Sequence, residues 1–311
     1  MNAEAHLGFA CFGGTVSIHV RGADEADGER LAERGRGILL DAHRRLSRFD
    51  PDSELSRLNN DPRAAVPASP LLRRLAAAVP FAVAESGGLV DATLVDEIER
   101  AGYAESLEPS DLPPARSAPG EERPPARPHP DAAWRTVGVD EEAGTVQRPP
   151  GLKIDSGGIA KGLLADIVGE QLGATRTYAV DCCGDIRLGG SARLARKLRV
   201  EDPFGGEPLH ELSLYNGAVA TSGITRRRWR GPGGQPAHQI LDPRSGSPAF
   251  TGVVQATAVA PNALLAEVLA KAALLSGPER AARWLRFGGV VVDEGGEVAV
   301  VAAQRPLAAA A

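Results

Sequence analysis

The sequence predicts an α+β fold, and three observations support this prediction. Apolar residues recur at helical spacing over residues 24–46, 70–85 and 262–275, and the last of these segments is strongly apolar. Short segments typical of strands lie between them, and residues 253–259 alternate well enough for a central strand. Strands and helices intermingle without strict βαβ alternation, which favours mixed or antiparallel sheets flanked by helices over a doubly wound sheet.

The composition is that of an ordinary globular protein. The chain has 311 residues, 43% of them hydrophobic and 24% charged, which is enough for one large domain or two intimate halves. A formal net charge of −5 does not imply a surface that binds nucleic acid. No run approaches the roughly 20 apolar residues that would span a bilayer, so no membrane segment is expected.

The N-terminus and the cysteines indicate a cytoplasmic protein. The first ten residues lack the basic and apolar regions of a secretory signal. Cys11, Cys182 and Cys183 form an odd set with two adjacent members, which is a poor disulfide framework. We therefore expect reduced, buried thiols.

In the first half, we expect a strand over 9–20, broken early at Gly13 and Gly14, before the helix at 24–46. Ser53 is placed to cap a short helix from Glu54, and Gly87 to end the helix at 70–85. Residues 89–94 are expected to form a loop or a strand. Prolines cluster over 106–130, which predicts a flexible surface insertion with no helix or strand.

In the second half, short strands are expected at 134–139 and 145–147, followed by a glycine turn and a helix that ends near residue 173. Further strands are expected at 178–187, 197–200, 212–214, 218–221 and 238–242. The chain should close with a helix at 278–286 and a hairpin formed by 290–292 and 298–302.

The stretch DSGGIAKG at 155–162 combines an acid, two glycines and a lysine at the expected start of a helix. Backbone N–H groups and the helix dipole attract phosphate at such a place, and Lys161 could add a positive charge. The alternative is an ordinary helix start. The motif alone does not decide between the two.

Other polar residues lie at the ends of strands or in turns, where sites are commonly placed: Asp91, Asp155, Asp185, His238 and Asp242. Each could also be an ordinary turn residue. His238 is a candidate general base because an imidazole titrates near neutrality, or it is a hydrogen-bonded histidine within a strand. Histidine or cysteine spacing typical of a metal site is absent, although a hard cation held by carboxylates and carbonyls leaves no such pattern.

A basic cluster, Arg226 to Arg230, surrounds Trp229. It could bind phosphate or nucleic acid, or it could be a solvated loop. The acidic total offers no wider basic footprint, so we favour the loop and expect no nucleic-acid partner.

Six short sequence motifs, in this order, resemble those of the ApbE family of flavin transferases (FAD:protein FMN transferases). They are LSRFDPDSEL at 46–55, SGGLVDAT at 86–93, DSGGIAKG at 155–162, CGD at 183–185, TSG at 221–223 and HQILDPRSG at 238–246. The resemblance covers nearly the whole chain except the proline-rich insertion. It implies a single domain over 1–311, built from two T-fold-like halves with the cofactor cleft between them.

The resemblance also implies a reaction. In this family, FMN is transferred from FAD to a threonine or serine hydroxyl of an acceptor flavoprotein with magnesium, and AMP is released. Such chemistry needs charge neutralisation at the phosphates and a base for the hydroxyl.

Site residues are carried over position by position. The residues implied to contact FAD are Phe49, Leu89, Val90, Asp91, Asp155, Lys161 and Leu241. His238 and Asp155 are implied to be catalytic, with His238 near the reacting phosphate as a base or orienting group. The carbonyl of Gly158 is implied to be a metal ligand, and so is Glu267, which stands at the position of an aspartate ligand of the family and is still a hard oxygen ligand.

The chain departs from the family pattern in its late helix, LAEVLAKA at 265–272. An aspartate and a threonine that ligate magnesium in the family are replaced by Glu267 and Lys271. Because a protonated lysine cannot ligate a cation, we expect Lys271 to place its ammonium where the metal would sit, paired with Glu267. The alternative is an outward-pointing surface pair. Cys183 also stands where glycine is usual before Gly184.

Two classes of function therefore remain. The first is a flavin transferase with altered metal use, and the second is an FAD-binding member that has lost transfer through a degenerate magnesium site. The expected partners are FAD and an acceptor flavoprotein met in the cytoplasm, and the oligomeric state is left open.

Overall fold

The computed structural model describes residues 4–106 and 123–307, which are built around one eight-stranded sheet. Its order is β1-β2-β6-β7-β10-β15-β16-β17, and every neighbouring pair is antiparallel. The strands are β1 (Ala5–Cys11), β2 (Gly14–Arg21), β6 (Thr177–Cys182), β7 (Asp185–Gly189), β10 (Gly217–Gly223), β15 (Val253–Ala260), β16 (Gly289–Asp293) and β17 (Val298–Val301).

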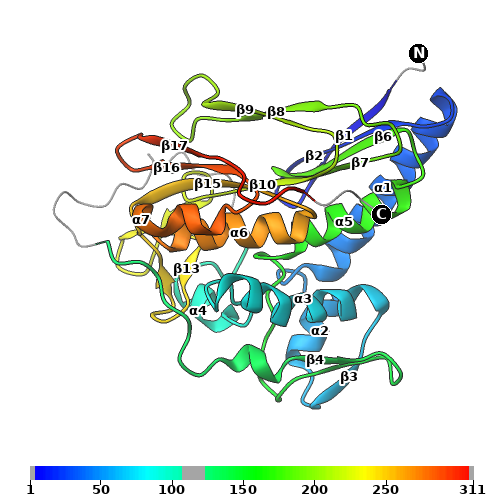
Figure 1. The fold of residues 1–311 in the computed structure, drawn as a ribbon. Coiled ribbons are helices and arrows are strands. Elements are labelled where there is room, and N and C mark those ends of the chain that lie inside the picture. The colour runs from blue at the N-terminus through cyan, green and yellow to red at the C-terminus, as the bar shows by residue number, and fades with distance from the viewer. Residues whose placement is uncertain (1–3, 107–122, 308–311) are drawn as a thin grey trace.

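Helices form two layers below this sheet in the view of Figure 1. The first layer is α1 (Glu25–Leu46), α5 (Ala160–Leu172) and α6 (Ala263–Leu275), which pack on the strands. The second is α2 (Glu54–Asn60), α3 (Pro70–Ser86) and α4 (Val95–Arg100). Helix α3 joins the layers because it packs on α6 and on a small sheet of β3 (Ala65–Pro67), β5 (Thr145–Gln147) and β4 (Gly138–Asp140).

The large sheet divides into two similar halves. In the first half, β1 and β2 lead to α1 and α5, and the chain returns as β6 and β7. In the second, β10 and β15 lead to α6, and the chain returns as β16 and β17. The predicted α+β class, with antiparallel sheets flanked by helices, is confirmed.

Three short strand pairs complete the described part of the fold. A ribbon of β8 (Arg196–Val200) and β9 (His210–Leu214) runs along the top of Figure 1. The connection from β10 to β15 holds β11 (Arg228–Arg230) paired with β12 (Pro236–His238), and β13 (Leu241–Asp242) paired with β14 (Ser247–Pro248).

The helix boundaries follow from capping residues. The side chains of Asp24, Ser69 and Asn262 accept backbone N–H groups at the starts of α1, α3 and α6. Gly87 ends α3 with a φ of 59°, in the left-handed region that glycine adopts freely. The three long helices predicted from apolar spacing therefore lie where the sequence placed them.

Three local expectations need correction. Residues 9–20 are not one strand but the turn and arms of the β1–β2 hairpin, because Gly13 has a φ of 70° and reverses the chain. Residues 134–139 are not one strand, because a 3₁₀ turn (Ala133–Thr136) precedes β4. Of the loop or strand expected at 89–94, the structure has the loop, formed by turns and bends. The helix expected at 278–286 is a single turn, α7 (Pro278–Ala281), followed by a 3₁₀ turn (Ala282–Trp284).

The predicted insertion is described only in part, since residues 107–122 lie outside the described residues. Residues 123–130 contain no helix or strand. Ala126 donates its N–H to the Leu275 carbonyl at 2.9 Å, and Arg127 donates to Asp242 at 2.8 Å. The described end of the insertion is thus attached to the end of α6 and to the β13 turn.

Among the described residues, every helix falls short of the length and apolar character that a bilayer crossing requires.

Candidate active site

One large cavity, of about 1820 Å³, opens between the sheet and the helices and is lined by residues of both halves. Ten of the eleven site residues predicted from the sequence line it: Phe49, Leu89, Val90, Asp91, Asp155, Gly158, Lys161, Leu241, Glu267 and Lys271. His238 does not. Segments more than 200 residues apart in the sequence therefore meet around one space.

The glycine turn at 155–162 forms one wall. The N–H of Asp155 donates to the Ala92 carbonyl at 2.8 Å, which joins this turn to the loop that carries Asp91. Within the turn, Asp155 Oδ1 accepts the N–H of Gly157 at 3.0 Å and lies 3.5 Å from the Arg48 guanidinium. The turn is held on both sides, so its carboxylate has a fixed position in the cavity wall.

Helix α5 starts without a side-chain cap of its own. Instead, Glu267 Oε2 on α6 accepts the N–H of Gly162 at 2.9 Å. This contact needs a glycine, because a Cβ built at Gly162 would lie 2.4 Å from the Ala263 carbonyl oxygen. One of the N–H groups that could have received a phosphate is therefore already bound by a carboxylate of the chain.

Two lysines and two carboxylates form a cluster at the junction of α5, α6 and β7. Lys161 pairs with Asp185, whose side chain is 1% exposed. Burial alone would lower the pKa of Lys161, but the carboxylates of Asp185 and Glu267 outweigh it and raise that pKa. Burial, reinforced by Asp185, raises the pKa of Glu267, and the two ammonium groups oppose this shift.

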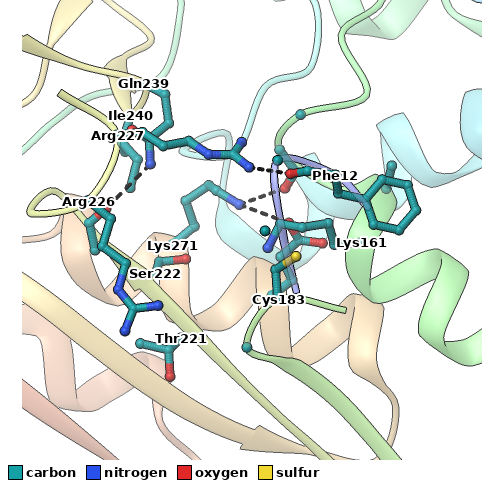
Figure 2. A pocket seen from close by; sticks show the side chains of 18 of the residues that line it. Phe12, Lys161, Cys183, Thr221, Ser222, Arg226, Arg227, Gln239, Ile240 and Lys271 are labelled. Atoms are coloured by element: carbon teal, nitrogen blue, oxygen red, sulfur yellow. Dashed lines mark hydrogen bonds and ion pairs between the residues drawn. The ribbon is translucent and has the colours of Figure 1, made fainter. Parts of the chain in front are cut away.

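Lys271 points into the cavity, not outward (Figure 2). Its ammonium donates to the Gly158 carbonyl at 2.6 Å and lies 3.5 Å from Glu267 Oε1. Lys271 therefore has the inward orientation expected from the sequence, and the alternative of an outward-pointing surface pair is excluded. The carbonyl expected to hold a metal instead accepts a hydrogen bond from an ammonium.

The residues present do not fit a magnesium site. Over residues 4–106 and 123–307, no three His, Cys, Asp or Glu side chains come together as a metal-binding group. The two oxygens expected to be ligands, from Gly158 and Glu267, are both contacted by Lys271. Magnesium prefers a nearly ideal octahedron of oxygens, which a cationic donor at its centre prevents.

An aromatic cluster, Phe49, Tyr103 and Trp229, lies beside Arg48, and of its rings Phe49 and Tyr103 line the cavity. Tyr103 stacks on Trp229 with centroids 5.0 Å apart and meets the edge of Phe49 at 5.3 Å. The Arg48 guanidinium lies 4.2 Å from the Phe49 centroid and 4.7 Å from the Tyr103 centroid. The sequence prediction missed Arg48 and Tyr103 as site residues, although Arg48 belongs to the motif at 46–55.

The basic cluster at 226–230 is only partly a solvated loop. Arg226, Arg227 and Arg228 line the cavity. Arg227, which precedes β11, donates at 2.5 Å to the carbonyl of Phe12 in the turn between β1 and β2 (Figure 2). Two nitrogens of Arg228, Nε and Nη1, are buried without a hydrogen-bond partner within the described chain, and burial lowers the pKa of Arg228. These guanidinium groups suit an anionic ligand.

Cys183 also lines the cavity, in the turn between β6 and β7. Its φ is 60°, in the left-handed region that costs energy for any residue with a Cβ. This backbone conformation is the physical reason that glycine suits the position. All three cysteines are free thiols, and Cys11 and Cys182 are buried.

His238 lies behind the cavity wall and is fully buried. Its ring packs edge-on against Phe250 with centroids 4.7 Å apart, and its Nδ1 accepts the N–H of Ile240 at 3.3 Å. Burial lowers the pKa of His238 to about 3, and the Ala249 carbonyl opposes this only in part. The structure therefore brings the neighbouring Leu241 to the cavity, but not the imidazole.

A profile of the ApbE family matches residues 12–292. The chain belongs to the ApbE family. Curated relatives include the FAD:protein FMN transferases of Haemophilus influenzae, 28% identical over 86% of this chain and 79% of that protein, and of Vibrio cholerae, 25% identical over 96% and 86%.

Solved structures share the fold. The ApbE protein of Thermotoga maritima superposes with a TM-score of 0.77 at 24% identity, covering 96% of this chain and 97% of that one. The Pseudomonas stutzeri flavinyl transferase ApbE gives 0.73 at 21% identity, covering 96% and 95%. The alternative of a member that has lost transfer is not favoured by these relatives.

Proposed function

We propose that this ApbE family member is an FAD:protein FMN transferase, which moves the FMN part of FAD to a threonine or serine hydroxyl of an acceptor flavoprotein. The supporting observation is that motifs from both halves of the fold line the same large cavity. Its lining includes the aromatic rings of Phe49 and Tyr103, which suit a planar ring, and the guanidinium groups of Arg226 to Arg228, which suit phosphates.

In this reaction the acceptor hydroxyl oxygen attacks the phosphorus of the FMN half of FAD. The new P–O ester bond forms as the bond from that phosphorus to the bridging oxygen breaks, and AMP leaves with the bridging oxygen. The hydroxyl proton must go to a base. Asp155 is our candidate because both contacts of its carboxylate within the described chain use Oδ1, which leaves Oδ2 to accept the proton.

The remaining predicted residues have supporting roles in the proposal. Phe49, with Arg48 and Tyr103, stacks on a ring of FAD, and Leu89, Val90, Asp91 and Leu241 line the cofactor. The ammonium of Lys161 pairs with the buried carboxylate of Asp185 and so compensates its negative charge at the cavity wall. His238 takes the orienting role of the two expected for it, because its buried ring supports the backbone of residues 239–241.

A cytoplasmic location is part of the proposal. It fits the three free cysteines, since such thiols persist in reducing compartments. The acceptor is then a flavoprotein domain that presents its hydroxyl on the cytoplasmic side.

The test is incubation of the purified chain with FAD and an acceptor flavoprotein domain. We expect a fluorescent acceptor band on a denaturing gel and one AMP released per flavin attached. Asp155→Asn should lower the rate by about 100-fold or more while FAD still quenches on binding, because a positioned base contributes 10²–10⁴-fold. FAD binding without fluorescent acceptor and without AMP would contradict the proposal.

A further inference from the structure

The surroundings of Lys271 go beyond an ordinary helix ion pair. Leu264 and Lys271 are the two residues of α6 that are not buried, because the helix packs on β10, β15, α5 and α3. The side chain of Lys271 is 15% exposed, and the cavity is what it faces. Its position is therefore fixed by the packing of α6.

The contacts of its ammonium are those of a bound cation. A lysine ammonium carries three N–H donors. The Gly158 carbonyl and the Glu267 carboxylate account for two directions, which leaves a donor for a ligand in the cavity. Glu267 is in turn fixed by the Gly162 N–H at 2.9 Å.

The charges of the cluster balance without a metal. Lys161 and Lys271 supply two positive charges, and Asp185 and Glu267 supply two negative ones. Of the other carboxylates near them, Asp155 contacts Arg48 through Oδ1, and Asp181 accepts the Gly184 N–H at 2.6 Å. A divalent cation added here would meet two ammonium groups and no spare carboxylate of the cluster.

We propose that the Lys271 ammonium is the resident cation of this cavity, which donates its remaining N–H to the diphosphate of the ligand and makes transfer independent of divalent metal. This inference rests on the proposed FMN transfer for its catalytic part. A fixed ammonium at the phosphates supplies electrostatic stabilisation without an ion to recruit.

The first experiment compares rates of FMN transfer by the native chain with EDTA and with excess magnesium. We expect the two rates to agree within about twofold, whereas a metal-dependent reaction would lose several kcal/mol of stabilisation in EDTA. A drop of about tenfold or more in EDTA that magnesium reverses would overturn the inference and leave the proposed function standing.

Two variants at one position sharpen the test. Lys271→Thr replaces the ammonium by a neutral oxygen ligand beside Gly158 and Glu267, and Lys271→Met removes the charge without adding a ligand. Both should lose about 100-fold in EDTA, and magnesium should restore about tenfold or more to Lys271→Thr alone. A native rate for Lys271→Met would overturn the inference, because the ammonium would then not be needed.

A binding measurement makes the inference independent of transfer. Magnesium is titrated into each protein with FAD present and followed by calorimetry, and FAD-induced thermal stabilisation confirms that each variant is folded. The native chain and Lys271→Met should give no binding heat, and Lys271→Thr should bind magnesium. Stoichiometric binding by the native chain, or none by Lys271→Thr, would overturn the inference. Absence of transfer in every arm would instead refute the proposed function.

Discussion

Lys161 and Lys271 stand on two helices that face the same cavity, and each contacts a buried carboxylate. Lys161 belongs to a motif that resembles the family pattern, and its ammonium pairs with Asp185. Lys271 departs from the family pattern, and its ammonium contacts a backbone carbonyl and a carboxylate while facing the cavity. The carboxylate of the first pair, Asp185, does not line the cavity, whereas Glu267 of the second pair lines it beside Lys271.

This difference extends to the other groups of the site. His238, Gly162 and Asp185 are buried behind the wall, whereas Phe49 and Tyr103 stand on its surface. Changes in the buried groups should therefore alter the stability of the fold, and changes on the surface should alter ligand binding. Four predictions can break or sharpen that division.

The largest effect is expected from Lys161→Met, which leaves the Asp185 carboxylate buried and unpaired. Removing one partner of a buried pair costs about 3–5 kcal/mol of unfolding free energy. Urea unfolding measures this value, with Lys271→Met as the control that should lose less, because Glu267 keeps the hydrogen bond from the Gly162 N–H. The double variant Lys161→Met/Asp185→Leu should regain much of the loss. Equal losses for the two lysine variants would erase the distinction between them.

The second effect is a pH dependence set by His238. Its pKa falls from 6.5 to about 3 on folding, so the unfolded chain binds the proton more tightly. Stability from this residue is present above pH 6.5 and is lost as the pH falls toward 3. Between pH 6.5 and about pH 4.5 the loss should be about 2 kcal/mol, since the slope rises to about 1.4 kcal/mol per pH unit only below pH 6.5.

Unfolding curves of the native chain and of His238→Phe across this range measure the difference in slope. The variant should lose less stability on acidification than the native chain. Parallel pH profiles would show that the imidazole is reached by water or protons in the folded state, as a cavity-facing base would be.

These buried features differ in how far the sequence predicted them. The long helices and the glycine turn were predictable, because apolar spacing, capping residues and turn residues are local signals. The inward direction of Lys271 was predictable as well. Because α6 is apolar on nearly all sides, its charged side chain was expected to face a polar cavity inside the protein.

The missed parts depend on contacts between distant segments. Tyr103 is a lone aromatic after α4, and only the approach of Trp229 and Arg48 gives it a place at the cavity. The burial of His238 depends on Phe250 and on the strand pairs around it, which no local pattern specifies. The sequence therefore identified the motifs that form the site, but it did not predict how deeply each side chain is buried.

The third effect concerns the close approach of α5 and α6. Gly162→Ala would place a Cβ 2.4 Å from the Ala263 carbonyl oxygen, where backbone must move. Overpacking of this kind costs about 1–3 kcal/mol, and it should also disturb the contact between Gly162 and Glu267. Gly158→Ala is the matched control, since its Cβ would meet nothing within 4 Å. Thermal unfolding of both variants measures the costs, and similar values would contradict the packing described for Gly162.

The smallest effect is expected at the cavity surface. Tyr103→Leu removes a ring that stacks on Trp229 and meets the edge of Phe49. An aromatic contact contributes about 1 kcal/mol beyond its buried area, so the Kd for FAD should rise by about fivefold. Flavin fluorescence quenching measures the Kd, and urea unfolding should show little change. Tyr215→Leu is the control, because Tyr215 is exposed and does not line the cavity. If Tyr103→Leu destabilised the fold as strongly as Gly162→Ala while leaving the Kd unchanged, Tyr103 would belong with the buried groups.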